Sequence, residues 1–235
     1  MHVTPITTRI FREGEDLISF ILARVRRFPE GAVLVVTSKI VALAERRTAV
    51  VKDGGTKMRL IRSESSLVVP TKYACLTVKD GMVMASAGID ESNADGKLIL
   101  LPRDSYLVAR RIRTALRKRF GTKQCGVLIT DSRLMPLRAG VTGVALGYAG
   151  FKGIRDYRGT PDIFGRLFHM SRTDVADSLA TAAVLEMGEG AEQRPLALIT
   201  GATVDFVERV SRHELHIDVH EDLYGPLYAR VRRKT

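Results

Sequence analysis

The chain of 235 residues lacks the sequence features of several large classes of protein. It has only two cysteines, Cys75 and Cys125, which lie far apart and each within a strand-like run. We therefore expect reduced core thiols, with no disulfide and no zinc site. No stretch approaches the apolar length that spans a bilayer, and the opening residues contain no uninterrupted apolar segment, so we expect a cytoplasmic protein without a membrane partner.

Three signatures of common enzyme sites are also absent. Without a Gly-x-Ser-x-Gly turn, a Ser-His-Asp hydrolase is not supported. Without a P-loop lysine motif or a Gly-x-Gly-x-x-Gly fingerprint, any nucleotide must be bound by other means. The histidines are expected at the surface or at sheet edges, and His216 and His220 flank a segment that alternates like a strand.

Acidic residues are outnumbered, 26 against 37 Lys and Arg, which gives a formal net charge of +11. The densest basic segment, 105–120, repeats an apolar residue every four positions, which predicts an amphipathic helix with a basic outer face. No aromatic residues interleave with these charges, so a solvated face on a protein with polyanionic ligands is favoured over a nucleic-acid footprint. A non-catalytic nucleic-acid-binding protein stays open as an alternative. The basic tail at 230–234 is expected to fray.

The 45% hydrophobic content is enough for a complete core in one unit spanning 1–235, which is either one domain or two interwoven lobes, because no clear linker divides the chain. Helical and strand-like segments alternate, with some strands in hairpin order, which predicts an α+β fold of mixed, largely antiparallel sheets with inserted helices. The expected helices are 15–28, 39–47 with Ser38 as N-cap, 105–120, and 174–187 with Thr173 as N-cap. The expected strands are 32–37, 73–78, 82–87, 126–130 and 141–149, with a polar loop at 150–168.

Two aspartates, Asp90 and Asp131, each follow an apolar run and precede a turn rich in small residues. A strand that delivers a carboxylate at its end is suited to holding a hard cation such as Mg²⁺ or Mn²⁺ over a phosphate. The competing interpretation is that both are ordinary turn aspartates. The loop 88–96 adds Asn93 and further oxygen ligands, and Ser132 follows Asp131 directly.

Other charged residues are candidates for the same site. Glu189 lies between two glycines after the predicted helix 174–187, and it either reaches a metal or merely belongs to a helix-ending turn. Lys39, Arg138 and Arg166 either steady phosphate or carboxylate oxygens or are surface cations. Arg166 is favoured because the adjacent glycine permits close approach.

The sequence resembles the coenzyme F420-0:L-glutamate ligase family, whose members add γ-linked glutamate to a deazaflavin coenzyme. The matching segments follow the family order over most of the chain. They are 35–41 with 44–45, 87–93, 101–102, 129–132, 138–140 with 143–147, 156–159 with 164–166, and 176–177 with 187–189.

The resemblance implies amide-bond formation driven by GTP or ATP, with Mg²⁺ or Mn²⁺, in an intertwined homodimer that uses L-glutamate. It places metal ligands at Asp90, Asp131, Ser132 and Glu189. It places nucleotide contacts at Ser38, Asn93, Met187, Gly188 and Glu189, to which we add Lys39. Asp90, Asp131 and Arg166 are the expected catalytic residues, acting on an acyl phosphate of the acceptor.

The departures from the family pattern concern the acceptor. The family's Gly-Leu-Pro opening reads Thr7 to Phe11 here, a family lysine is replaced by Leu43, and Leu134-Met135 replaces a Gly-Arg pair. A site that keeps its phosphate chemistry while its acceptor side changes is expected to ligate a different acceptor. The segment 136–140, Pro-Leu-Arg-Ala-Gly, resembles a branch of the family that adds glutamate in folate metabolism. This resemblance predicts a folate- or pteroate-type (pterin) acceptor, with the deazaflavin F420-0 as the alternative.

Overall fold

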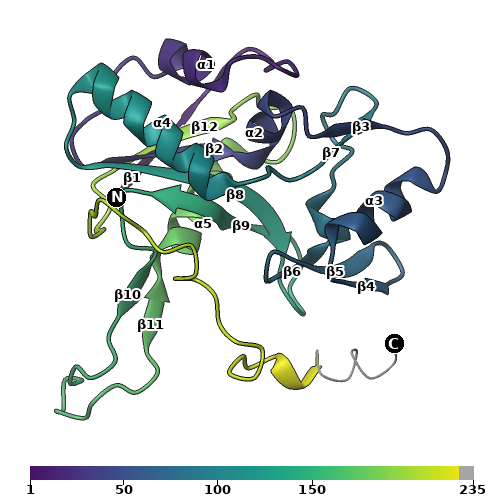
Figure 1. Cartoon of the computed structure of the whole chain (residues 1–235). Coiled ribbons are helices and arrows are strands. Elements are labelled where there is room, and N and C mark those ends of the chain that lie inside the picture. Colours follow the sequence, from purple (N-terminus) through teal and green to yellow (C-terminus); the bar gives the residue numbers. More distant parts are fainter. Residues whose placement is uncertain (228–235) are drawn as a thin grey trace.

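A five-stranded sheet lies at the centre of the fold, with the two largest apolar clusters on its two faces (Figure 1). The structure is a computed structural model that describes residues 1–227, so the basic tail at 230–234 lies outside the described residues. The strand order is β1 (His2–Ile6), β12 (Leu196–Thr200), β2 (Ala32–Thr37), β8 (Cys125–Leu134) and β9 (Val141–Ala149). Only the central β2–β8 pair is parallel. A central parallel strand is covered on both faces, which explains why β2 is apolar almost throughout.

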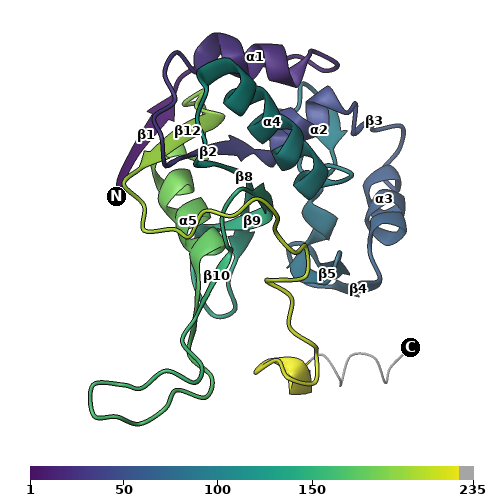
Figure 2. The same ribbon diagram turned by 60° about the vertical axis from the view of Figure 1, so that its left-hand side comes forward.

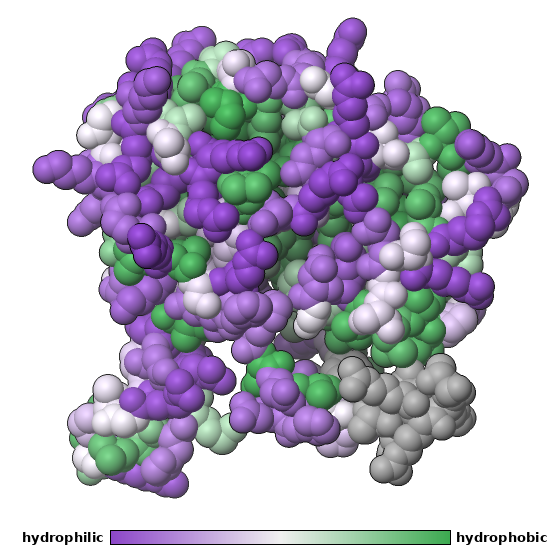
Figure 3. All heavy atoms as spheres, in the orientation of Figure 1, coloured by the Kyte–Doolittle hydropathy of each residue, from purple (hydrophilic) through white to green (hydrophobic). Residues whose placement is uncertain are grey.

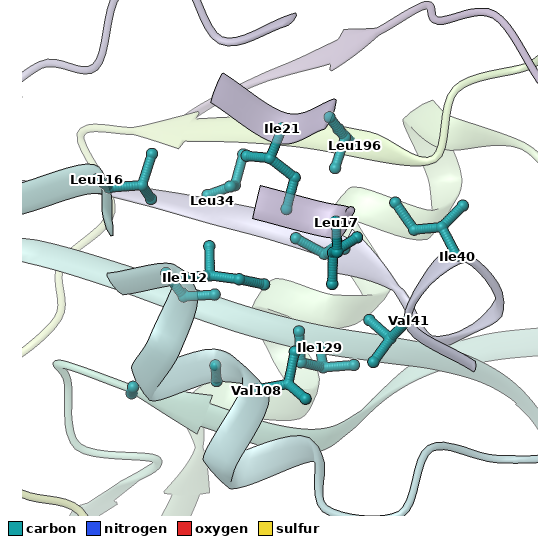
Figure 4. Packing of buried hydrophobic residues seen from close by; sticks show 14 of the residues in the cluster. Leu17, Ile21, Leu34, Ile40, Val41, Val108, Ile112, Leu116, Ile129 and Leu196 are labelled. Carbon is teal, nitrogen blue, oxygen red and sulfur yellow. The ribbon is translucent and has the colours of Figure 1, made fainter. Parts of the chain in front are cut away.

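Helices cover both faces of this sheet (Figure 2). One face is covered by α1 (Leu17–Arg24), α2 (Ser38–Ala44) and α4 (Ser105–Phe120), and the other by α5 (Val175–Met187). Figure 4 shows the first of these layers, where Ile21, Leu34, Ile112 and Ile129 meet between α1, α4 and the sheet. Burial of these side chains holds the helices in place, and thereby fixes the loops at the sheet edge.

A smaller lobe follows α2 and contains the Asp90 loop. It consists of α3 (Thr56–Glu64), the pair β3 (Thr48–Val50) and β7 (Lys97–Ile99), and the meander β4 (Leu67–Pro70), β5 (Cys75–Lys79) and β6 (Met82–Ala85). Glu64 of α3 forms ion pairs with Arg47 at 2.8 Å and Lys79 at 2.9 Å. These pairs join α3 to the start of β3 and to the end of β5. The lobe has its own apolar cluster around Ile61 and Leu98.

A two-stranded arm of β10 (Ile154–Asp156) and β11 (Arg172–Asp174) projects from the body between β9 and α5 (Figures 1 and 2). The sequence predicted a polar loop over 150–168, and the structure keeps most of that range as loop but adds a short antiparallel ribbon that pairs 154–156 with 172–174. Pairing of Ile154 with Asp174 closes the base of the ribbon. The short strands were missed because their pairing partner lies beyond the predicted loop.

The predicted α+β class is confirmed, as are the helix at 105–120, the strand at 32–37 and the hairpin around Asp80 and Gly81. Both cysteines are buried and free, as expected. The predicted helix at 15–28 is shorter, because Val25 adopts an extended backbone and packs into the core.

Two predicted helix caps are wrong. Ser38 is the first residue of α2 rather than its N-cap, which is Thr37, and the Ser38 hydroxyl is used elsewhere. The N-cap of α5 is Asp174 and not Thr173, because the Asp174 carboxylate accepts the backbone N–H of Asp177 at 2.9 Å. The predicted helix 39–47 ends at Ala44.

The contact between α5 and β9 depends on Gly143. A Cβ atom at this position would lie 2.3 Å from the backbone oxygen of Ala180. We expect Gly143→Ala to lower the free energy of unfolding by about 1–3 kcal/mol, because neither backbone can move without disturbing the core. Urea denaturation measures the change. Gly54→Ala is the control, since a Cβ there meets nothing within 4 Å, and an equal loss in both variants would contradict the packing argument.

Candidate active site

Parallel pairing of β2 and β8 brings Ser38 to Asp131. Thr37 at the end of β2 is paired with Thr130 on β8, so the residue that follows each of them lies at the same edge of the sheet. There the Ser38 hydroxyl donates to Asp131 Oδ1 at 3.3 Å. Two residues 93 positions apart in the chain are thus joined by the register of one strand pair.

Asp131 lies inside β8, whereas the sequence predicted it at the end of a strand. The strand continues to Leu134 because its pairing with β9 resumes after a bulge between Ile129 and Thr130. Burial raises the pKa of the half-buried Asp131 carboxyl above its usual value, and the negative charge of Asp90 acts in the same direction. The positive charge of Arg133 and the Ser38 hydrogen bond oppose this rise. A nearby cation would therefore stabilise the ionised form of Asp131.

Asp90 does not end a strand either. Strand β6 stops at Ala85, a 3₁₀ turn at Ser86–Gly88 follows, and Asp90 pairs with Ile99 in an isolated bridge. Lys39 Nζ lies 2.7 Å from Asp90 Oδ2. Burial disfavours the charged form of Asp90, but the hydrogen bonds from Lys39 and Ser92 outweigh it and hold the pKa of Asp90 below its usual range.

The Lys39 ammonium also fixes the loop beyond Asp90. It donates to the backbone oxygen of Ser92 at 2.9 Å and to the Ser92 hydroxyl at 3.1 Å. The Ser92 N–H and hydroxyl in turn donate to the two oxygens of Asp90, at 2.7 and 2.9 Å. One cation from α2 thereby holds the loop of the smaller lobe against the main sheet.

The turn after α5 joins both carboxylate segments. Ser132 Oγ donates to Glu189 Oε1 at 2.5 Å, and Asn93 Nδ2 donates to the backbone oxygen of Gly190 at 3.2 Å. Glu189 lies in the glycine-flanked turn that the sequence predicted, and Met187 is buried at the end of the helix. Gly188 has φ 80°, a conformation that favours glycine and lets the chain turn towards β8.

Most of the predicted site residues are thus gathered into one cluster. We call this set the carboxylate cluster: Ser38, Lys39, Asp90, Asn93, Asp131, Ser132 and Glu189. Arg166 and Arg138 lie outside this cluster. Arg166 lies on the arm, where its backbone N–H donates to Asp162 at 2.9 Å, and Arg138 lies in the exposed connection between β8 and β9.

Sequence reasoning missed Arg133, which is only 8% exposed. Residues two apart on a strand share a face, so the position of Asp131 on β8 also places Arg133. The sequence signal for Arg133 was the two-residue period with which side chains alternate along a strand. The prediction missed it because it ended the strand at 130, before Arg133. The predicted basic face of α4 was also partly wrong, because Arg113 is buried and both Arg113 and Arg117 pair with Glu208.

Within residues 1–227 the structure gathers no group of three or more His, Cys, Asp or Glu residues that could hold a metal as placed. His169, His213, His216 and His220 are exposed, as expected, but the segment 216–220 is not the alternating strand, because 216–218 have no regular structure and a turn begins at Val219. The same part of the chain contains no helix long and apolar enough to cross a membrane.

Comparison with known proteins places this cluster in a family context. The model of the F420-0:Gamma-glutamyl ligase family matches residues 5–201, a range that includes the whole carboxylate cluster. The chain belongs to this family. This match supports the prediction from the sequence that the chain belongs to a family of glutamate ligases.

Relatives named coenzyme F420:L-glutamate ligase match over most of the chain. The protein of Methanopyrus kandleri is 35% identical over 223 residues, covering 86% of this chain and 87% of the relative. That of Archaeoglobus fulgidus is 31% identical over 232 residues, covering 91% and 92%. That of Methanothermobacter thermautotrophicus is 40% identical over 144 residues, covering 60% and 57%.

The raised pKa of Asp131 predicts how stability changes with pH. A carboxyl whose pKa is higher in the folded state favours folding while it is protonated, and that contribution is lost as pH rises from about 4, where the unfolded group ionises. We expect Asp131→Asn to be at least as stable as the wild type at about pH 7, with the difference shrinking towards about pH 4. Thermal unfolding across pH measures it.

Asp156→Asn is the matched control. The exposed Asp156 has its pKa lowered to about 2 by hydrogen bonds from Arg158, so its contribution to stability is present at neutral pH and is lost as pH falls. Asp156→Asn should therefore show no gain at neutral pH. An Asp131→Asn protein that is clearly less stable than the wild type at neutral pH would contradict the burial argument.

Proposed function

We propose that the protein is a nucleotide-dependent ligase that adds L-glutamate to the deazaflavin coenzyme F420-0, using GTP or ATP. The observation that carries the proposal is that the whole carboxylate cluster falls within the range matched by the F420-0:Gamma-glutamyl ligase model. Relatives that cover about nine tenths of the chain are named for the same reaction.

The choice of acceptor corrects the sequence-based prediction of folate. The matched relatives are named for coenzyme F420, and no finding favours a pterin. Leu134 and Met135, which the sequence analysis took as acceptor-side changes, are 63% and 47% exposed at the end of the β8–β9 hairpin. Their exposure gives no support for a closed pterin pocket, so F420-0 is the acceptor proposed here.

The proposed chemistry begins with activation of the acceptor. A carboxylate does not condense with an amine in water unaided, so the γ-phosphoryl group of the nucleotide is first transferred to it. The α-amine of glutamate then attacks the acyl phosphate, forming the amide and releasing phosphate. Lys39 supplies positive charge at the edge of the cluster, and Ser38, Asn93 and the turn at Gly188 and Glu189 are the proposed nucleotide contacts.

A divalent cation is part of the proposal, with Asp90, Asp131, Ser132 and Glu189 as its ligands. All four offer oxygen, which Mg²⁺ and Mn²⁺ prefer. The charge of Asp90 raises the pKa of Asp131, so the two carboxylates lie within electrostatic reach and a cation would relieve their repulsion. A bound cation would neutralise charge on the nucleotide phosphates. Lys39 now holds Asp90, so it would have to share that carboxylate.

A ligation assay tests the function and the acceptor together. The protein is incubated with GTP or ATP, Mg²⁺ or Mn²⁺, L-glutamate and one of F420-0, dihydropteroate or folate, and mass spectrometry detects glutamate addition. We expect the highest kcat/KM with F420-0. A higher kcat/KM with a folate or pteroate would favour the other acceptor, and no addition to any acceptor would refute the ligase proposal.

The same assay tests the carboxylates. Asp90→Asn and Asp131→Asn should each lower kcat by about two orders of magnitude or more at saturating metal, because an amide is a poorer ligand for a hard cation. Far-ultraviolet circular dichroism checks that both variants fold. Glu186→Gln, an exposed change on the outside of α5, is the control and should keep wild-type activity.

We also propose that two copies of the chain form a homodimer through the arm. Exposed apolar side chains gather near its end, where Ile163 is 91% and Phe164 89% exposed, and Figure 3 shows hydrophobic surface on this projection. Leu167 and Met170, on the returning side of the arm, are exposed as well. A long ribbon with an apolar end is stabilised when a partner covers it.

Light scattering at micromolar concentration tests the dimer. Phe164→Ser should shift the protein towards the monomer, because it removes the aromatic side chain from the apolar patch. Tyr73→Ser is the matched control, since Tyr73 is also 89% exposed but lies on the smaller lobe. A wild-type protein that is monomeric, or an equal shift in both variants, would exclude this role of the arm.

A further inference from the structure

Arg133 is a buried guanidinium whose hydrogen-bonding capacity is mostly unused. The residue is 8% exposed, and its Nε and Nη2 atoms have no hydrogen-bond partner among the described residues. Its Nη1 atom reaches only the backbone oxygen of Val83, at 3.5 Å. Arginine stays protonated in proteins, so β8 carries a buried positive charge with two free donors.

The neighbouring carboxylates do not form hydrogen bonds with this charged group. Asp131 and Asp177 act on Arg133 electrostatically, but each is hydrogen-bonded elsewhere. Asp131 accepts from Ser38 at 3.3 Å, and Asp177 accepts the backbone N–H of Ala145 at 2.7 Å. Arg133 forms no ion pair within residues 1–227.

A second buried arginine shows what a structural role looks like in this protein. Arg113 is also 8% exposed, but its Nε donates to the backbone oxygen of Cys125 at 2.8 Å. Its two other nitrogens donate to the Glu208 carboxylate at 3.1 and 3.2 Å. Buried charged donors are normally satisfied in this way, so the free donors of Arg133 require a different explanation.

The position of Arg133 supplies that explanation. It shares a face of β8 with Asp131 and lies where β8 meets β6 of the smaller lobe, beside Val83. The carboxylate cluster therefore borders Arg133 along the strand. Adjacent Nε and Nη2 atoms form a planar fork that fits two oxygens of a carboxylate or a phosphate.

We propose that Arg133 binds an oxyanion of one of the ligase substrates, through paired donation from Nε and Nη2 to a carboxylate or a phosphate. The inference rests on the proposed function, and it makes Arg133 a binding residue of that site. The oxyanion comes from the nucleotide phosphates, from L-glutamate or from the acceptor, and the experiment distinguishes these sources.

Direct binding and kinetics of three variants test the inference. Calorimetry gives Kd for GTP, L-glutamate and F420-0 separately, and steady-state assays give the corresponding KM values. In Arg133→Met we expect Kd and KM to rise about 10- to 100-fold for one of the three ligands, because a charged pair of hydrogen bonds is lost. Arg133→Lys keeps the charge but loses the fork, so its effect on the same ligand should be intermediate.

Arg113→Met is the matched control, because it removes a buried arginine of equal exposure whose donors are all used within the chain. It should lower Tm while leaving all three Kd values unchanged. If Arg133→Met and Arg133→Lys also lower only Tm, with every Kd unchanged, Arg133 is a structural cation and the inference is wrong.

Failure of the proposed function has a different outcome. If the wild type ligates no acceptor but an Arg133-dependent Kd is measured for one ligand, the oxyanion site stands and the ligase proposal falls. If the wild type ligates F420-0 with Kd values that do not depend on Arg133, the ligase proposal stands and the oxyanion site falls. If the wild type neither ligates nor binds any of the three ligands, both fall.

Discussion

The parallel pairing of β2 with β8 is the constraint on which the candidate site depends. Because Thr37 and Thr130 are register partners, the first residue of α2 and the Asp131 carboxylate emerge at the same edge of the sheet. A slip of one residue in this pairing would turn the side chains of β8 to the opposite face and separate Ser38 from Asp131. The apolar residues on both faces of β2 and β8 prevent that slip, so core packing fixes the geometry of the polar cluster.

Two further contacts complete the cluster from distant parts of the chain. Lys39 brings in the Asp90 loop of the smaller lobe with a 2.7 Å ion pair, and Ser132 brings in Glu189 from the turn after α5. Each contact crosses from the sheet to an element that packs on it. The cluster is therefore assembled at a junction of three elements, where small movements of the lobe or of the turn would alter the spacing of the carboxylates.

The two aspartates of the cluster differ electrostatically. Lys39 stabilises the ionised form of Asp90, whereas burial disfavours that of Asp131. The site thus holds one carboxylate, Asp90, whose negative charge is balanced by a lysine, and one, Asp131, that is buried without such a lysine. Arg133 adds a buried positive charge beside Asp131, which gives the edge of β8 the mixed polarity expected where an anionic substrate and a cation are held together.

The sequence by itself determined the fold class, five of the twelve strands of the described residues and the identity of the acidic and hydroxyl residues at the site. Apolar periodicity and turn residues are local signals, and they predicted the helix at 105–120, the hairpin at Asp80-Gly81 and the glycine-flanked position of Glu189. The order of family-like segments indicated which of these residues belong together.

Only the tertiary structure decided how those residues meet. It extended β8 through Asp131 by pairing with β9, buried Arg133 on the same face, and placed Arg166 on the arm away from the carboxylate cluster. The Ser38 hydroxyl, which was predicted to cap a helix, donates a hydrogen bond to Asp131 instead. These outcomes depend on strand register and on packing between residues far apart in the chain, and local sequence patterns do not contain that information.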